Sequence, residues 1–255
     1  MAREAKRPAA GPRWRVWLGA AGLGVLCVST AIAGLKVHEF ALTDPQFWLS
    51  RDNRSALTIE GLGHASRIKV MRVFAADFGH SIFSVPLAER RRRLLAIDWV
   101  RDASVSRVWP DRLVVRIHER VPVAFVALRT GVLLIDADGV LLEVPPAANF
   151  AYPVLSGMRD DDTEERRRER VHCLIRLEED LGDRAGDVSE VNATDPDNLR
   201  MVARVDNGAA ELIMGDDNFG ARYRNFVKHY PEIHKRSPGA RTFDLRLADR
   251  IAAEE

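Results

Sequence analysis

The stretch WVRDASVSRVWPDRLVVRIHERVPVA, residues 99–124, decides the fold of its part of the chain. Apolar and polar side chains alternate on both sides of Trp109-Pro110, which is typical of two strands that each bury one face. Proline fixes one backbone dihedral and lacks an N–H donor, so the Trp-Pro-Asp triplet predicts the turn between the strands. The second strand ends at Glu119-Arg120, just before Pro122.

The segment that precedes this pair predicts one strand and two helices. Residues 56–60 read as a short strand, residues 66–78 as a helix with Ser66 as its cap, and residues 86–95 as a second helix opened by proline. The first helix has a broad apolar face made of Ile68, Val70, Met71, Phe74 and Phe78. The four arginines at 90–93 are expected to face water. The order strand-helix-helix-strand-strand predicts a three-stranded sheet covered by two helices.

The remainder of the chain predicts a second, strand-rich part. Strands are expected at residues 123–128, 132–135, 140–144, 152–155, 188–191, 199–205 and 210–214. Helices are expected at 163–181, where Gly182 ends the helix and Arg166 to Arg170 face water, and at 219–235. A last strand covers 242–247 and continues toward Ala253. The predicted fold class is α+β.

Residues 16–35 form an uncharged run of twenty residues, which as a helix matches the hydrocarbon thickness of a bilayer. Residues 1–15 carry five basic side chains and one acidic one, and a basic flank favours the cytoplasmic side. The run therefore predicts a transmembrane helix with the rest of the chain outside. A cleaved signal peptide is the alternative, since residues 31–33 read Ala-Ile-Ala. Both interpretations place residues 36–255 outside the cytoplasm.

Composition and motifs argue against a catalytic or nucleic-acid-binding protein. The net charge is +1, and the two cysteines, Cys27 and Cys173, lie in segments where a disulfide between them is implausible. The segment DADG at 136–139 shares the start of a calcium loop but lacks the glycine and glutamate that such a loop requires, so it predicts a hairpin turn. We expect no enzyme activity, catalytic residue, metal, cofactor, small-molecule substrate or nucleic-acid partner.

With these residues in view, the chain resembles the bacterial FtsQ/DivIB family of cell division proteins. A strand-helix-helix-strand-strand module directly after one membrane segment looks like a POTRA domain. The residues that carry the resemblance as structural family motifs are Gly61, Trp109, Pro110, Glu119, Arg120 and Pro122. Further matches are Asn207-Gly208, Met214-Gly215 and Asp244-Leu245-Arg246.

The resemblance implies a division into five segments. These are a cytoplasmic basic tail at 1–15, a transmembrane helix at 16–35, a linker at 36–54, a POTRA domain at 55–122 and a β-rich domain at 123–255. It also implies a divisome scaffold in the inner membrane, enriched at the septum, with a single membrane pass and periplasmic domains. Its partners would be FtsB, FtsL, other divisome membrane proteins and the lipid bilayer.

An exposed sheet edge offers unpaired N–H and C=O groups to a strand of another chain. Because residues 242–253 are the last strand-like segment, we expect nothing downstream to cover them and a partner strand to add there. Arg200 is aligned by the resemblance with an arginine that pairs with a partner carboxylate. The predicted partner-binding residues are Arg200, Thr242, Phe243, Leu245, Arg246, Leu247, Asp249, Arg250 and Ile251.

Two alternative functions remain at this point. One is another POTRA-containing export or outer-membrane assembly factor, although only one module precedes a small domain here. The other is an exported hydrolase with a cleaved signal.

Overall fold

The computed structural model describes residues 14–53, 55–146, 148–206, 208–247 and 250–254. The predicted basic tail before residue 14, Asn207 and Asp249 lie outside the described residues. Packing divides the chain into two compact units. The first contains residues 1–60, 71–93 and 104–116, and the second contains residues 61–70, 94–103 and 117–255.

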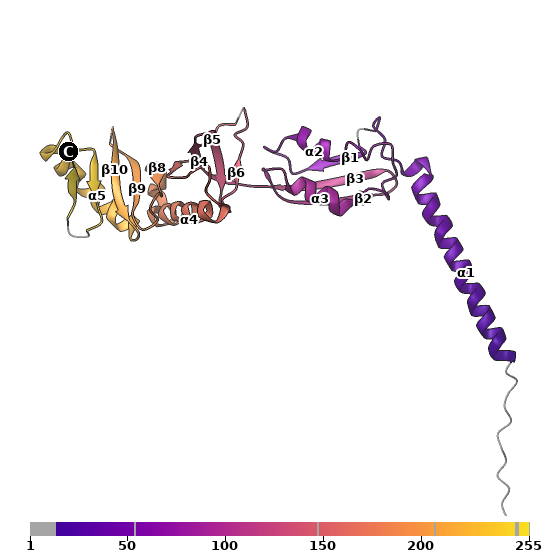
Figure 1. The fold of residues 1–255 in the computed structure, drawn as a ribbon. Helices are drawn as coiled ribbons and strands as arrows, with labels where there is room; N and C mark the ends of the chain where they lie inside the picture. The colour runs from indigo at the N-terminus through magenta and orange to yellow at the C-terminus, as the bar shows by residue number, and fades with distance from the viewer. Residues whose placement is uncertain (1–13, 54, 147, 207, 248–249, 255) are drawn as a thin grey trace, which may run out of the picture. The chain divides into compact units, whose positions relative to one another are not determined.

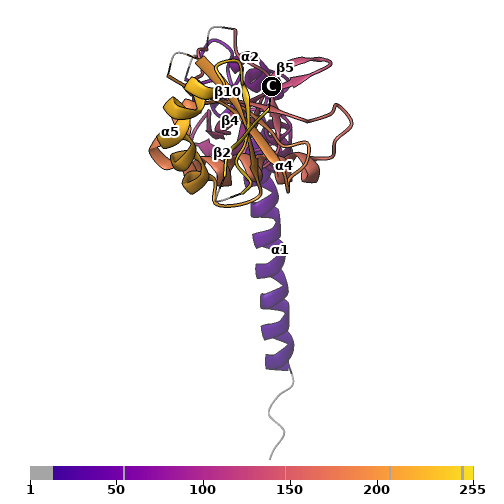
Figure 2. The same ribbon diagram turned by 90° about the vertical axis from the view of Figure 1, so that its left-hand side faces the viewer.

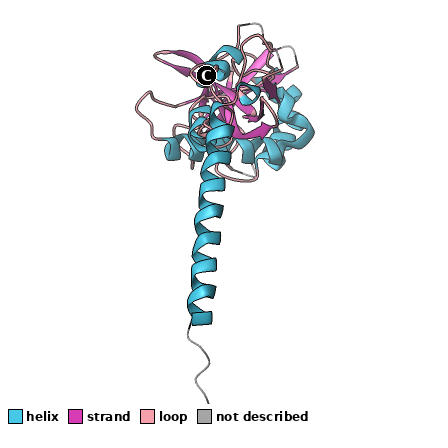
Figure 3. Ribbon diagram, turned by 90° about the vertical axis from the view of Figure 1, so that its right-hand side faces the viewer, coloured by secondary structure: helices cyan, strands magenta, loops and turns pink. Residues whose placement is uncertain are grey.

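The first unit begins with α1 (Trp14–Thr43), which Figures 1 and 3 show as one uninterrupted helix. Its part Leu23–Thr43 is long and apolar enough to cross a membrane, and none of the residues in its apolar window is buried inside the protein. The helix runs beyond residue 35 into the segment predicted as a linker. An ion pair between Lys36 and Glu39, at 3.0 Å and one turn apart, supports this extension. A short 3-10 helix, η1 (Pro45–Phe47), follows with Asp44 as its cap.

A three-stranded sheet and two helices follow in the predicted order. They are β1 (Leu57–Glu60), α2 (Arg67–Val73), α3 (Leu87–Leu95), β2 (Val100–Val108) and β3 (Arg112–Glu119). The strand order is β1-β3-β2, and β1 runs parallel to β3. Along β3 the residues Leu113, Val115 and Ile117 are buried while their neighbours are exposed or half-buried, which confirms the alternation seen in the sequence.

The predicted apolar face of the first helix is wrong in part. Val70 and Phe74 are fully buried, but Ile68 and Met71 are exposed. The helix also ends at Val73 instead of continuing to residue 78. The chain then tightens, because the amide of Phe74 bonds to the carbonyl of Met71 three residues back instead of four. The tighter turn ends the regular helical spacing after Val73, whereas Ile68 and Met71 precede it and lie on the exposed side of α2.

The predicted exposure of the four arginines in α3 is wrong for Arg90. Its guanidinium donates two hydrogen bonds of 2.7 Å to the carboxylate of Asp77, and both side chains are less than a tenth exposed. The other three arginines of the run are exposed, as expected. Arg90 points inward because Asp77, thirteen residues earlier, supplies a buried carboxylate for it.

The second unit holds a sheet of nine strands in the order β12-β11-β10-β9-β8-β7-β4-β5-β6. Their bounds are β4 (Pro122–Leu128), β5 (Gly131–Asp136), β6 (Leu141–Leu142), β7 (Val154–Ser156), β8 (Val188–Asn192), β9 (Leu199–Val205), β10 (Gly208–Gly215), β11 (Thr242–Asp244) and β12 (Ala252–Glu254). Two helices, α4 (Glu164–Leu181) and α5 (Phe219–Arg236), lie on one side of the strands (Figure 1). A second short 3-10 helix, η2 (Gly182–Asp187), follows α4.

The main core of this unit lies between the sheet and its two helices. It is built from alternate side chains of the strands, among them Met201 and Leu212, and from one face of each helix, among them Leu174 and Phe226. Figure 2 looks onto the C-terminal end of the unit, where α5 lies beside β10. The sheet is mixed, because β10 pairs antiparallel with β9 but parallel with β11.

The arginine run of α4 does not simply face water as predicted. Thr163 caps the start of the helix, and Gly182 ends it as expected. However, Arg167 and Arg168 donate to the carbonyls of Gly139 and Asp138 in the turn after β5. The run therefore ties the helix to a strand turn.

Candidate functional site

The C-terminal end of the sheet is formed by three strands. β11 pairs with β10 on one side and with β12 on the other, through Thr242↔Glu254, Phe243↔Ala253 and Asp244↔Ala252. The prediction that nothing downstream covers residues 242–247 is therefore wrong. The chain reverses after β11 and lies back along it, so the terminal edge in the described part of the chain belongs to β12.

Asp244 and Arg246 shape the reversal. Asp244 accepts a 3.0 Å hydrogen bond from the backbone amide of Arg246 and a 2.6 Å ion pair from its guanidinium. These hydrogen bonds from Arg246 lower the pKa of the Asp244 carboxyl, against the opposing effect of burial. Between them, Leu245 continues the pairing by one residue, since its amide donates to the carbonyl of Ile213 at 2.9 Å. A turn held by an Asx-type bond and an ion pair directs the following residues away from β10.

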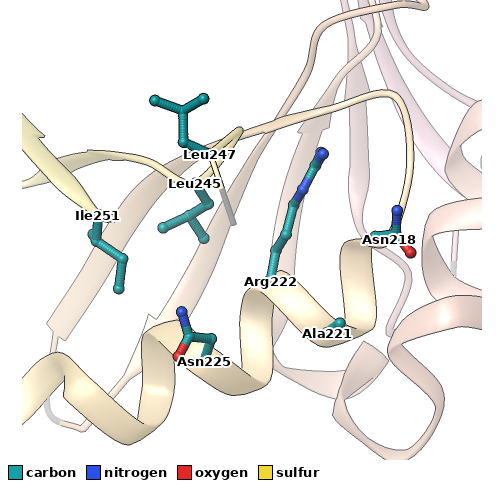
Figure 4. A pocket seen from close by; sticks show the side chains of 7 residues that line it. All are labelled: Asn218, Ala221, Arg222, Asn225, Leu245, Leu247 and Ile251. Carbon is teal, nitrogen blue, oxygen red and sulfur yellow. The ribbon is translucent and has the colours of Figure 1, made fainter. Parts of the chain in front are cut away.

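The returning segment and α5 enclose a hollow of about 290 Å³ (Figure 4). Leu245, Leu247 and Ile251 line one side of it, as Figure 4 shows. A second hollow of about 370 Å³ shares Ile251 and Asn225 with the first and extends along α5. We call the two together the α5 groove; its lining residues are Asn218, Ala221, Arg222, Asn225, His229, Glu232, Ile233, Arg236, Leu245, Leu247, Arg250 and Ile251.

The predicted partner-binding residues of this segment differ in how deeply they are buried. Phe243 and Leu245 are buried in the core, where the ring of Phe243 lies 5.1 Å from that of Phe226. Their side chains pack in the core, and their contact with a partner stays a prediction. Leu247 is 49% exposed and Arg250 is also exposed, so both are accessible at the groove. Of the remaining three, Thr242 and Ile251 are half-buried and Arg246 is exposed.

The contribution of α5 to this site was not predicted from the sequence. The helix residues that line the groove, such as Asn218, Arg222, Asn225 and His229, recur every three or four positions. This spacing places them on one face of the helix, next to the buried face that carries Tyr223 and Phe226. The polar stripe is visible in the sequence, but nothing there shows that a terminal segment lies beside it.

Arg200 lies on β9, three strands from the edge. Its guanidinium is 3.5 Å from the carboxylate of Glu211 on β10, and both side chains are close to half exposed. In the register of the sheet Arg200 stands opposite Ile213, which in turn stands opposite Asp244. Arg200 is thus accessible, and it already has an acidic neighbour on its own sheet.

The backbone conformation at position 61 accounts for the glycine there. Its φ is +81°, a conformation that side chains with a Cβ rarely adopt, and a Cβ there would lie 2.0 Å from the carbonyl oxygen of Ile117. Glycine at this position lets the chain pass directly against β3.

Glu119 and Arg120 act as a clamp inside the second unit. The Glu119 carboxylate accepts hydrogen bonds from the amides of Gly63, His64 and Ala65, at 2.9, 2.9 and 2.7 Å. Glu119 thus binds the segment before α2, whereas the side chain of its neighbour Arg120 points in the other direction.

Arg120 completes the clamp at the turn after β5. Its guanidinium lies 2.6 Å from the carboxylate of Asp136, which is buried and also accepts from the amides of Asp138 and Val140. Asp136 is thus a turn-forming residue, as the hairpin interpretation predicts. Pro122, the last member of this motif, is buried at the start of β4. Trp109 and Pro110 form the turn between β2 and β3 through a cis peptide bond.

The described residues contain no group of three or more His, Cys, Asp or Glu side chains arranged to hold a metal ion. What the C-terminal edge offers is a short strand with a neighbouring groove, an arrangement suited to holding an extended segment of another chain.

Comparison with known proteins assigns both parts of the chain. Residues 53–120 match the sequence profile of the POTRA domain, FtsQ-type, and residues 124–246 match that of the cell division protein FtsQ/DivIB, C-terminal. The cell division protein FtsQ of Koribacter versatilis (strain Ellin345) is 33% identical over 239 residues, which cover 91% of this chain and 68% of that protein. The chain belongs to the FtsQ/DivIB family.

Other similar proteins have the same description. FtsQ of Shewanella oneidensis is 26% identical over 94% of this chain and 86% of its own length. Among solved structures, the major extracytoplasmic domain of DivIB from Geobacillus stearothermophilus, in its trans isomer, is similar over 48% of this chain and 96% of that one, with 21% identity and a TM-score of 0.28.

Membership of the FtsQ/DivIB family decides several predictions. The protein is a non-enzymatic, membrane-anchored cell division protein with a POTRA domain and a β-rich C-terminal part. The exported hydrolase and the outer-membrane assembly factor are thereby set aside. The α+β fold class and the order of elements in the POTRA module are confirmed.

Proposed function

We propose that this FtsQ/DivIB-family protein is a divisome scaffold that binds FtsB, and through it FtsL, by strand addition at the outer edge of β12. In this role it links early and late division proteins to septal wall synthesis. It spans the inner membrane once, with its N-terminus in the cytoplasm and its periplasmic domains enriched at the septum. The division into a POTRA domain of residues 55–122 and a β-rich domain of residues 123–255 remains a prediction.

The observation that supports the binding mode is the position of β12 at the end of the nine-stranded order. Ala252 and Ala253 are small and exposed, so another backbone can approach without displacing bulky side chains. An added strand would gain main-chain hydrogen bonds along this edge. Because β12 has only three residues, backbone pairing alone supplies little affinity, and side chains beside the edge must contribute.

The α5 groove supplies such side-chain contacts. Leu247 and Ile251 offer apolar surface next to the edge. Arg222, Arg236 and Arg250 line the same groove with one lining carboxylate, Glu232, and Arg222 is also paired with Asp217 at 2.7 Å. A partner segment with one apolar anchor and acidic neighbours would complement this surface. We therefore expect the FtsB segment that binds here to be extended and acidic.

The test measures binding of a synthetic peptide, an extended acidic segment of FtsB from the same organism, to the full chain in nanodiscs. Leu247→Glu should weaken binding about tenfold or more, because about 1.4 kcal/mol is a factor of ten and burying a leucine is worth about 1.5–3 kcal/mol. Val132→Glu is the matched control. Val132 is 60% exposed, against 49% for Leu247, and lies on β5 near the opposite edge of the sheet, so this variant should bind normally.

A chain that ends after Arg250 separates strand addition at β12 from displacement of β12. This shortened chain lacks β12 but keeps β11, and we expect that the peptide no longer binds to it. Tighter binding to the shortened chain would mean that the partner pairs with β11 in place of β12, which contradicts the proposed mode. Normal binding to Leu247→Glu would likewise remove the groove from the site.

A further inference from the structure

Five aromatic side chains gather where α1 ends, within the first unit. They are Phe40, Phe47, Trp48, Phe83 and Trp109, which we call the aromatic collar. The ring of Phe47 is buried at its centre, 5.7 Å from Phe40, 5.3 Å from Phe83 and 6.1 Å from Trp109. The outer members remain largely open: Trp109 is 68%, Phe40 51%, and Trp48 and Phe83 each 41% exposed. Such a concentration of exposed aromatic surface marks an interaction site.

The collar is fastened to the end of α1. The hydroxyl of Ser81 donates to the carbonyl of Ala41 in the helix at 2.7 Å. The amide of Ile82 donates to the carbonyl of Phe47 at 2.9 Å, and Trp48 forms an isolated antiparallel bridge with Ser81. These bonds leave no free linker between the helix and the segment that carries Phe83. The height of the collar relative to a membrane is therefore set by α1.

Arg107 holds the same segment from the sheet side. Its guanidinium donates to the carbonyls of Ile82 and Val85, at 2.6 and 2.7 Å. Phe83 lies between these two anchor points, so its loop is held with the aromatic ring outward. The exposure of Phe83 is thus built into the fold.

The length of α1 places the collar at the membrane surface. Its 30 residues extend about 45 Å at about 1.5 Å per residue. A bilayer with its headgroup layers is about 40–45 Å thick, so a helix that starts at one surface ends at the other. Phe40 belongs to the last turn of α1, and the other collar residues are joined to it. Tryptophan and other aromatic rings favour this headgroup layer.

We propose that the aromatic collar is a second membrane contact, in which Trp48, Phe83 and Trp109 enter the lipid headgroup layer and seat the module on the bilayer. The occupant is the bilayer itself, because the collar is continuous with the membrane helix. This contact also gives exposed Trp109 a role that its turn alone does not require, since a turn needs Pro110 but not an open indole.

The test uses the full chain with one tryptophan left in place. The chain contains Trp14, Trp17, Trp48, Trp99 and Trp109, and each of the four others is changed to Phe so that only Trp109 emits. The chain is placed in phosphatidylcholine vesicles with or without a nitroxide on the upper acyl chain. We expect Trp109 emission to be lost with the nitroxide, and to lie at shorter wavelength than an indole in water.

The matched control keeps only Trp99, which is buried and donates to the carbonyl of Glu143. Its emission should not change with the nitroxide, and it also reports that the chain is folded. A third chain that keeps only Trp48 repeats the measurement at another collar position. Trp109 emission that is equal in both vesicles, or equal losses at Trp109 and Trp99, would overturn the proposal. Emission reached by aqueous iodide but not by the nitroxide would instead assign the collar to water or to a protein partner.

Discussion

Asp77 and Arg90 show how a single residue in a charged run can differ from its neighbours. Arg90 belongs to four consecutive arginines, yet it lies inside the protein, with two 2.7 Å hydrogen bonds to the carboxylate of Asp77 and a longer one of 3.4 Å to Glu89. Arginine suits this geometry because its planar fork matches a carboxylate with two parallel bonds. The pair joins α3 to the turn after α2, and breaking one partner would leave the other charge buried.

Asp77→Ala should therefore reduce the free energy of unfolding by about 3–5 kcal/mol, the usual loss when one member of a buried ion pair is removed. Thermal unfolding of the full chain in detergent, followed by circular dichroism, measures the change. Arg92→Ala is the control, since Arg92 is exposed on the same helix and should change stability by less than about 0.5 kcal/mol. The double variant Asp77→Leu with Arg90→Met should be more stable than Asp77→Ala alone. A double variant that is equally unstable would contradict a role for the unpaired charge.

Charged residues were the least predictable from sequence, and for a physical reason. Whether Arg90 or Arg170 faces water depends on carboxylates, Asp77 and Asp162, that other segments bring near. The alternation of buried and exposed side chains along β3, which begins with buried Leu113, was predictable because burial follows a period of two within one strand. Local periodicity can be read from the chain, whereas long-range pairing of charges cannot.

At the scale of elements, the caps of α4 were visible in the sequence and the fold-back of the last strand was not. Thr163 and Gly182 signal the ends of α4 by their own chemistry. Residues 245–251 contain no Gly or Asn-Gly turn signal, yet Asp244 pairs with Ala252 and also binds Arg246 just after β11. For this reason the sequence predicted one long edge strand where the structure has two short ones. The groove beside it was missed for the same reason.

The start of α4 should make stability depend on pH. Burial alone would raise the pKa of Asp162, but the backbone amide of Arg159 and the guanidinium of Arg170 outweigh it, so the pKa of Asp162 is lowered. A carboxyl with a lowered folded-state pKa stabilises the fold above its unfolded pKa of about 3.9 and loses that contribution as pH falls through the folded value. We expect the urea midpoint of the full chain to fall as the pH is lowered from about 5 toward 3 for this reason.

Asp162→Asn should flatten this dependence, because the amide side chain does not titrate. Asp161→Asn is the neighbouring control, since Asp161 is largely exposed and should leave the slope unchanged. Equal slopes for the parent chain and Asp162→Asn would show that Asp162 does not carry the effect.

At the scale of the whole molecule, the proposed scaffold role predicts where the protein gathers in cells. An N-terminal fluorescent fusion of the full chain, in a bacterial host depleted of its own family member, should form bands at midcell. Leu247→Glu should spread evenly around the envelope if the α5 groove recruits a partner there, whereas Val132→Glu should keep the bands. Fluorescence microscopy of dividing cells decides between these outcomes. An even envelope signal for the parent fusion would argue against septal enrichment.

The bonds between Ser81 and the end of α1 have a consequence for orientation about the membrane normal. A flexible linker would let the first unit rotate freely relative to α1. Because the unit is hydrogen-bonded directly to the end of α1, it rotates together with the helix. Each residue of an α-helix advances the azimuth by about 100°. Adding or removing one residue within α1 would therefore rotate the first unit by about 100° about the membrane normal, while its height above the membrane would hardly change. The rotation of α1 in the lipid thus determines which face of this unit is directed toward neighbouring proteins in the membrane.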